Sequence, residues 1–233
     1  MRGMQNEATA SESKRRLNWK RLFKFWAIVG CVSVPIFLYD RRKRELEYLR
    51  KRNESMKAAL GGEIELIDEN GRLTSTKEFL GKWILIYFGY THCPDICPEE
   101  MEKMCTVVDL LEKNKNIFVQ PIFITVDPKR DTTEIVQKYV KEFSPKIKGF
   151  TGSKDQIEAA MKAYRVYSGA MEKDEYDEYV VDHTIITYLI NPVGEFVDYY
   201  GRTKNAQQMF NSVSKHIENY AALQKKSWLQ LFS

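Results

Sequence analysis

Residues 83–90 (WILIYFGY) form an almost unbroken apolar run, which a folded chain accommodates as a strand buried on both faces. Such strands occupy the centre of α/β sheets, between layers of helices. Cys93 and Cys97 follow the run, and Pro98 comes directly after the second cysteine. Because proline suits the first position of a helix and pushes the preceding residue out of helical conformation, we expect Cys97 to be an N-cap. Thiols above a helix N-terminus are favoured as thiolates, which suits either disulfide chemistry or a soft metal.

The rest of the domain alternates between short apolar runs and amphipathic segments. The turn signal at residues 68–71 (DENG) separates two strand-like pieces, residues 63–67 and Leu73, and predicts a hairpin. We expect further strands at residues 118–126, 184–190 and 195–200, and helices at residues 98–114, 132–143, 156–167 and 206–223. This order of elements is that of a thioredoxin-like α/β sandwich, which carries its active site after a central strand, where the two cysteines lie.

An uncharged apolar stretch, residues 25–39, lies between two basic clusters near the start of the chain. With Leu22 and Phe23 it reaches about 27 Å as a helix, close to the roughly 30 Å of a bilayer core. We therefore expect a disordered basic segment at residues 1–21, a transmembrane helix at 22–39, a charged helical stalk at 40–60, the globular domain at 61–223 and a tail at 224–233. Basic residues are about equally dense on both sides of the stretch, so charge does not predict its orientation.

Charge and cysteine content exclude some classes of protein. The net charge is only +4, and most of the excess sits in the basic clusters that flank the apolar stretch, which favours anchoring at a membrane surface over nucleic-acid binding. Four cysteines are too few for a disulfide scaffold in a chain of this length. Cys31 lies inside the apolar stretch, and we expect it to pack in the membrane rather than mark a lipoprotein cleavage site. Cys105, Met101 and Met104 share the apolar stripe of a helix and are expected in the core.

His183 precedes the strand expected at residues 184–190. In a thioredoxin-like sheet that position approaches the loop after the central strand, so His183 would lie near the cysteines. Two thiolates and an imidazole suit Cu(I), whereas zinc usually takes a fourth ligand. His92 points away from Cys93 if the segment is extended, and His216 is expected to be exposed on the last helix. These residues leave metal binding and disulfide exchange both open.

Three motifs resemble those of the Sco (SenC-like) copper chaperones: residues 87–100 (YFGYTHCPDICPEE), 126–132 (VDPKRDT) and 181–184 (VDHT). The resemblance implies a thioredoxin-like domain in the intermembrane space, tethered by one span to the mitochondrial inner membrane. It implies one copper ion per chain, bound by Cys93, Cys97 and His183. Asp127 matches an acidic family position near the site, where it either orients the histidine or loop or belongs to a strand-end turn before Pro128. Glu7 and Glu12 are unlike a mitochondrial transit peptide, so the import signal is not predicted.

The resemblance also implies partners: a copper-donating chaperone, and cytochrome c oxidase subunit II, whose CuA centre receives the copper. The alternative function is a thiol–disulfide oxidoreductase that keeps the subunit II cysteines reduced. His183 separates the two, because an oxidoreductase needs no third ligand. A peroxiredoxin-like peroxidase fits less well, since it needs neither the second nearby cysteine nor the distal histidine. The oligomeric state, a homodimer included, and the oxidation state of the copper stay open.

Overall fold

The computed structural model describes residues 37, 39–44, 60–170 and 181–231. The chain divides into two compact units, Met1–Arg52 and Asn53–Ser233. In the first unit, residues 39–44 are helical and Arg44 pairs with Asp40 one turn earlier. The predicted disordered segment, most of the predicted span at 22–39 and most of the stalk lie outside the described residues. Within the described part of the chain, no helix is long and apolar enough to cross a membrane.

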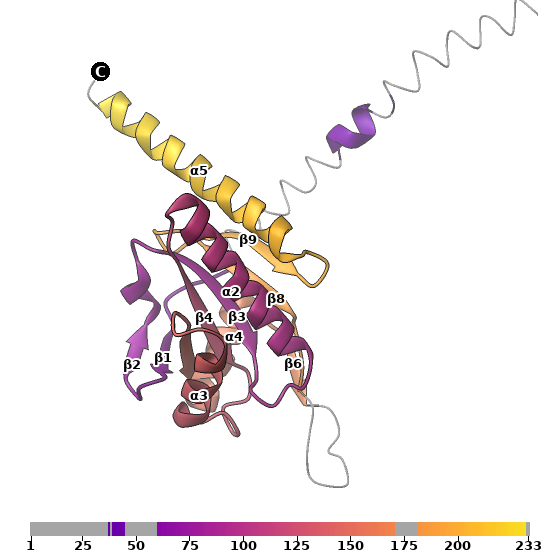
Figure 1. The fold of residues 1–233 in the computed structure, drawn as a ribbon, viewed down its shortest axis with the longest axis vertical. Helices are drawn as coiled ribbons and strands as arrows, with labels where there is room; N and C mark the ends of the chain where they lie inside the picture. Colours follow the sequence, from indigo (N-terminus) through magenta and orange to yellow (C-terminus); the bar gives the residue numbers. More distant parts are fainter. Residues whose placement is uncertain (1–36, 38, 45–59, 171–180, 232–233) are drawn as a thin grey trace, which may run out of the picture. The chain divides into compact units, whose positions relative to one another are not determined.

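A seven-stranded mixed sheet forms the middle of the second unit, with strand order β2-β1-β5-β4-β3-β8-β9 (Figure 1). The central strand β3 is parallel to β4 on one side and antiparallel to β8 on the other, and β9 pairs antiparallel with β8. β6 and β7 form a separate two-stranded ribbon. The strands are β1 (Glu65–Asp68), β2 (Leu73–Ser75), β3 (Trp83–Gly89), β4 (Val119–Thr125), β5 (Lys148–Thr151), β6 (Ser168–Ala170), β7 (Val181–His183), β8 (Ile186–Ile190) and β9 (Phe196–Gly201).

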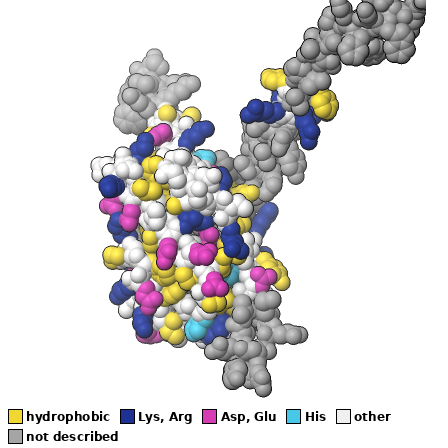
Figure 2. Space-filling model, turned by 45° about the vertical axis from the view of Figure 1, so that its right-hand side comes forward, with side chains coloured by type: hydrophobic (Ala, Val, Ile, Leu, Met, Phe, Trp, Pro, Cys, Tyr) yellow, Lys and Arg dark blue, Asp and Glu magenta, His cyan; other side chains and the backbone are white. Residues whose placement is uncertain are grey.

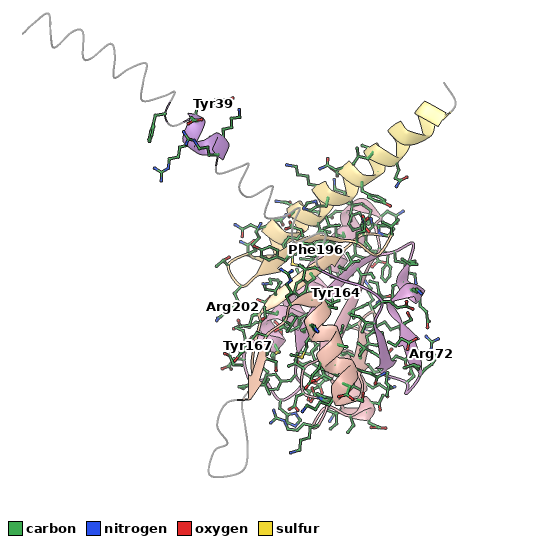
Figure 3. All side chains as sticks on the ribbon, turned by 180° about the vertical axis from the view of Figure 1, so that it is seen from behind. Tyr39, Arg72, Tyr164, Tyr167, Phe196 and Arg202 are labelled. Carbon is green, nitrogen blue, oxygen red and sulfur yellow. The ribbon has the colours of Figure 1, made fainter. Side chains whose placement is uncertain are left out.

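Helices cover both faces of the sheet. α2 (Ile96–Lys115) is the crossover between β3 and β4, and α3 (Thr133–Phe143) and α5 (Ala206–Leu231) pack beside it, as Figure 1 shows for α2 and α5. α4 (Lys154–Tyr164) crosses the opposite face and is in front in Figure 3. A short 3-10 helix, η1 (Thr76–Phe79), follows β2. The α/β sandwich predicted from the order of elements is therefore confirmed.

Side chains of β3 alternate between the two helical layers, as the period of a strand requires. Tyr87 contacts Cys97 on α2, whereas its neighbour Phe88 packs against Tyr164 on α4 with ring centroids 5.4 Å apart. Every residue of β3 and β4 is buried, so both predicted central strands are confirmed with ends that differ by one residue. On the face seen in Figure 2, the coloured Lys and Arg side chains are interspersed with Asp and Glu.

Several elements differ from the sequence prediction, among them η1 and the ribbon of β6 and β7, which were not predicted. β5 was not predicted, because Gly149 interrupts its short apolar run. A Cβ at position 149 would lie 2.5 Å from the Val136 side chain of α3, so the close packing of α3 on this strand requires glycine. α5 continues to Leu231 through the residues predicted as a tail. Residues 224–231 (QKKSWLQL) contain neither glycine nor proline, so nothing in the sequence ends the helix at residue 223.

Candidate metal centre

The two cysteines lie at the junction between β3 and α2. The helix begins at Ile96 with Asp95 as its N-cap, so the prediction that Cys97 caps the helix was wrong by two residues. Pro98 is the third helical residue rather than the first. It is tolerated there because the first amides of a helix have no intrahelical acceptor, so the N–H that proline lacks is not needed. The first intrahelical bond in this turn runs from Glu99 N–H to the Asp95 carbonyl.

The helix N-terminus stabilises one thiolate, that of Cys93. Hydrogen bonding from the Cys97 side chain lowers the pKa of Cys93 to about 5, and backbone amides of the first turn add to the effect. One of these, the Cys97 N–H, donates to Sγ of Cys93 at 3.4 Å. The pKa of Cys97 is instead raised, by its hydrogen bond to Cys93 and by burial. These shifts favour the thiolate at Cys93 and the thiol at Cys97.

His183 lies against Cys97, with Nε2 at 3.4 Å from Sγ. Its Nδ1 is 3.1 Å from the Thr184 carbonyl, which can only accept a hydrogen bond, so Nδ1 carries the proton. The lone pair of Nε2 therefore faces the sulfur. Burial lowers the pKa of His183, which keeps the ring neutral and able to ligate. The predicted approach of the β8 region to the cysteine loop is confirmed.

Aromatic rings and one glycine shape the space around Cys97. Tyr87 donates its hydroxyl to Sγ of Cys97 at 3.5 Å, and the rings of Tyr87 and Tyr90 lie edge-on to His183, with centroids 6.2 and 5.8 Å away. A Cβ on Gly89 would come within 3.0 Å of the same sulfur. The sequence analysis missed these roles. A glycine inside an apolar strand signals close approach of another group, and this signal could have identified Gly89.

The three predicted ligands are adjacent in pairs. Cys97 is the shared member, next to the Cys93 sulfur on one side and the His183 imidazole on the other. Among the residues that the structure describes, no three His, Cys, Asp or Glu side chains already converge as a closed metal cluster. All three cysteines of the described part are free thiols. The arrangement suits a soft ion that draws two sulfurs and one nitrogen together, and equally a disulfide between Cys93 and Cys97.

A buried carboxylate that the sequence analysis missed holds the loop in front of Cys93. Asp131 is fully buried and accepts hydrogen bonds from the Thr91 N–H at 3.0 Å, the Thr91 hydroxyl at 2.6 Å and the Thr125 hydroxyl at 2.6 Å. It thereby joins the ends of β3 and β4. Asp131 belongs to one of the three recognised motifs, but its contact with Thr91 spans 40 positions and leaves no local signal in the sequence.

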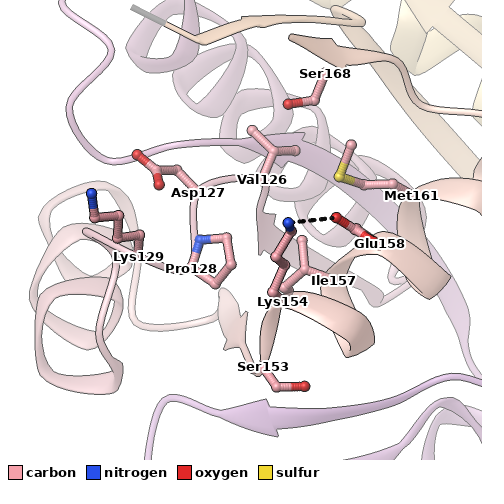
Figure 4. A pocket seen from close by; sticks show the side chains of 11 residues that line it. Val126, Asp127, Pro128, Lys129, Ser153, Lys154, Ile157, Glu158, Met161 and Ser168 are labelled. Carbon is pink, nitrogen blue, oxygen red and sulfur yellow. Dashed lines mark ion pairs between the residues drawn. The ribbon is translucent and has the colours of Figure 1, made fainter. Parts of the chain in front are cut away.

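Asp127 lies in the turn that follows β4, where its carbonyl accepts from the Asp131 N–H. Its carboxylate accepts from Nε of Arg130 at 2.5 Å, and the Arg130 guanidinium lies 5.6 Å from the centre of the Tyr90 ring. Asp127 also lines a cavity of about 700 Å³ beside α4 (Figure 4). The turn and the side-chain contact are thus both present, and the link from Asp127 toward His183 runs through Arg130 and Tyr90.

Other candidate residues fall outside the centre. His92 is held beside the cysteine loop, with Nδ1 at 3.0 Å from the Thr91 hydroxyl. His216 is half-buried and bonds to Asp198 at 3.0 Å, so the prediction of an exposed side chain was wrong. Met101 and Met104 are buried as predicted, whereas Cys105 packs only at the edge of the core. Cys31 lies outside the described residues.

The SCO1/SenC family model matches residues 52–218. This chain belongs to that family. The mitochondrial SCO1 homolog of Mus musculus is 44% identical over 205 residues, which cover 88% of this chain and 72% of that protein. The mitochondrial SCO2 homolog of Homo sapiens is 46% identical over 186 residues, which cover 78% and 70%. The resemblance based on three motifs is therefore confirmed.

Solved members of the family share the fold of the second unit. The crystal structure of Arabidopsis thaliana ScoI with copper bound has 43% sequence identity and a TM-score of 0.67, covering 70% of this chain and 100% of that chain. The crystal structure of yeast Sco1 with copper bound has 38% identity and a TM-score of 0.67, covering 72% and 94%. In both relatives the fold accommodates copper.

Proposed function

We propose that this chain is a copper metallochaperone that binds one copper ion through Cys93, Cys97 and His183. The observation that carries the proposal is the 3.4 Å approach of the His183 Nε2 lone pair to the Cys97 sulfur. A pure disulfide exchanger does not need an imidazole with its lone pair turned toward the thiol pair. Two sulfurs and one nitrogen are a ligand set for Cu(I). Copper-bound relatives of the same fold support the choice of metal.

Membership of the family and the exchangeable nature of the ligands support a role in copper delivery. The chain receives copper from a copper-donating chaperone and gives it to the CuA site of cytochrome c oxidase subunit II during oxidase assembly. It is held in the mitochondrial inner membrane by a span at residues 22–39, with the domain in the intermembrane space. The mitochondrial naming of the curated relatives supports this location. Asp127 acts as a positioning residue, through Arg130 and Tyr90.

A second candidate function is thiol–disulfide exchange on the cysteines of subunit II. The unequal thiols favour it, because Cys93 has a lowered pKa and Cys97 is buried with a raised one. A thiolate that attacks, followed by a thiol with a higher pKa that resolves, is the usual arrangement of a disulfide oxidoreductase, and Cys93 is slightly more accessible than Cys97. The two functions share a requirement, since only the reduced pair can hold copper.

Metal analysis of the purified, reduced chain tests the proposal. We expect one copper per chain for the wild type, and loss of copper from Cys93→Ser, Cys97→Ser and His183→Ala. Matched controls are Cys105→Ser and His216→Ala, which remove a thiol and an imidazole that lie elsewhere and should leave one copper bound. His183→Ala should change the reduction potential of the cysteine pair little. Full copper affinity in His183→Ala would show that the three-ligand site is wrong and leave disulfide exchange as the main function.

A further inference from the structure

The proposed copper ligands are poorly accessible from solvent. Cys93 is 8% exposed, Cys97 0% and His183 6%. Ligand exchange between two proteins requires that an atom of the receiving chain reach the metal while it is still bound to the donor. His92 precedes Cys93 directly in the chain, and its side chain is 47% exposed. It is therefore a group with a metal-binding atom that can meet a donor at the surface next to Cys93.

The hydrogen bonds of His92 fix which ring nitrogen is free. The Thr91 hydroxyl donates its only proton to Asp131 at 2.6 Å. The same oxygen lies 3.0 Å from Nδ1 of His92, and with its proton already used it can only accept there. Nδ1 is also 3.4 Å from Oδ1 of Asp131. Nδ1 therefore carries the proton, and Nε2 keeps its lone pair.

This arrangement matches that of histidines that ligate metals. A ligating histidine almost always donates its other ring N–H to a carboxylate, a carbonyl or a solvent oxygen, which fixes the tautomer and makes the ligating nitrogen more basic. Here Nδ1–H donates to the Thr91 hydroxyl, which in turn donates to Asp131, and these two hydrogen bonds form a relay. Asp131 is fully buried and also accepts a hydrogen bond from Thr125 on the neighbouring strand. The orientation of the His92 ring is thus built into the fold, although the ring lies outside the three-ligand centre.

We propose that His92 is a transient copper ligand that accepts Cu(I) at the surface and passes it to Cys93, an inference that rests on the proposed metallochaperone function. Nε2 binds the ion as one donor ligand leaves. The Cys93 thiolate then replaces Nε2, and Cys97 and His183 complete the centre. Copper remains Cu(I) throughout, so no oxidant or reductant is needed. Metal–ligand bonds form and break, and the Cys97 thiol releases its proton to solvent as its sulfur binds the ion. Asp131 and Thr91 are positioning residues for this step.

The decisive variant is His92→Asn, studied in the full, reduced chain. Asparagine places an amide N–H where Nδ1–H of histidine lies, so it can keep the bond to Thr91, but it has no atom at the position of Nε2. Uptake is followed by stopped-flow loss of colour from the bicinchoninate complex of Cu(I), and equilibrium affinity by competition with the same chelator. His216→Asn is the matched control, because His216 is also carboxylate-bonded but is remote from the cysteines in the sequence.

We expect His92→Asn to slow copper uptake by about tenfold while the final affinity and the one-to-one stoichiometry stay unchanged. Thr91→Val, which cuts the relay and leaves the imidazole, should slow uptake by a smaller factor. Wild-type uptake rates in His92→Asn would overturn the inference, and so would a parallel loss of equilibrium affinity, which would make His92 part of the final centre. A wild-type chain that takes up no copper would instead reject the metallochaperone function itself.

Discussion

His183 presents its unprotonated Nε2 to the sulfur of Cys97 at 3.4 Å, while its Nδ1–H is held by the Thr184 carbonyl. Two of the three proposed ligands are therefore already adjacent in the folded chain. A site whose ligands are held in this way loses less conformational freedom when the ion binds, which favours tight binding. Cys93, on the other side of Cys97, belongs to the loop and supplies the remaining sulfur.

The unequal thiols predict selective labelling. At about pH 6.5 most of Cys93 is thiolate, because its pKa is lowered to about 5, whereas burial raises the pKa of Cys105 to about 11. We expect a short pulse of iodoacetamide at this pH to alkylate Cys93 before Cys97 or Cys105, as measured by mass spectrometry of the digested chain. Cys93 labelling should fall as the pH drops through about 5. In the urea-unfolded chain the preference should disappear; equal rates in the folded chain would contradict the prediction.

Gly89→Ala should damage the centre directly. The added Cβ would lie 2.8 Å from a ring carbon of Tyr87 and 3.0 Å from Sγ of Cys97, so the sulfur or the ring must move. We expect the free energy of unfolding to fall by about 1–3 kcal/mol, from urea titration, together with a loss of copper affinity. Gly201→Ala is the matched control, because its Cβ would meet only the Ile185 carbonyl, at 4.0 Å. Similar effects of the two substitutions would rule out crowding at Cys97 as the cause.

Tyr87→Phe separates the hydroxyl of this residue from its ring. The ring stays as packing, and the hydrogen bond to the Cys97 sulfur is lost. We expect the free energy of unfolding to change by no more than about 1 kcal/mol. Copper affinity, measured by chelator competition, should fall by about tenfold, because the sulfur loses a donor that stabilises it as a thiolate ligand. Unchanged affinity would mean that the hydroxyl only fills space.

The bond between His216 and Asp198 predicts a pH-dependent contribution to stability. Burial alone would raise the pKa of Asp198, but the hydrogen bonds from His216 and the Tyr199 N–H bring it below its usual value. A carboxyl with a lowered pKa stabilises the fold above its unfolded pKa of about 4, and this contribution is lost as the pH falls through the folded value. We expect His216→Ala to lower the free energy of unfolding by about 1 kcal/mol at neutral pH.

Urea titration at two pH values checks this effect. The difference between wild type and His216→Ala should shrink in acid, as the pH falls through the folded pKa of the carboxyl and protonates it. Asn211→Ala, on an exposed position of the same helix, should change the free energy of unfolding by less than about 0.5 kcal/mol. A difference that persists unchanged in acid would assign the loss to packing instead of the ion–dipole contact.

The sequence predicted the features that depend on burial and on order along the chain. An apolar run as continuous as that of β3 fits only a central strand, and the following helix and parallel strand then fix where the loop of Cys93 and Cys97 lies. The same topology brings His183 to that loop. These inferences needed no knowledge of side-chain directions, which is why they were confirmed.

Features that depend on side-chain direction were missed or wrong. Proline is accepted at the first and at the third position of a helix, because neither position needs a backbone N–H. The sequence therefore could not show which of the two Pro98 occupies, and the predicted N-cap depended on that choice. The Thr91–Asp131 contact joins the ends of different strands, and no periodicity encodes it. The same holds for the Tyr87 hydroxyl. From the sequence alone Tyr87 is one more aromatic residue in a buried strand, and its hydrogen bond becomes evident only when the position of Cys97 is known.

Cys97 and His183 are 86 positions apart in the chain, and they meet only because β8 inserts beside β3. An unfolded chain would have to close a loop of that length before the sulfur and the imidazole could share an ion, at an entropic cost that nothing local offsets. Copper binding with full affinity therefore requires that the central sheet is assembled. Retention of the metal against a chelator can serve as a measure of sheet formation in any variant, and destabilised chains will release their copper when β8 separates from β3.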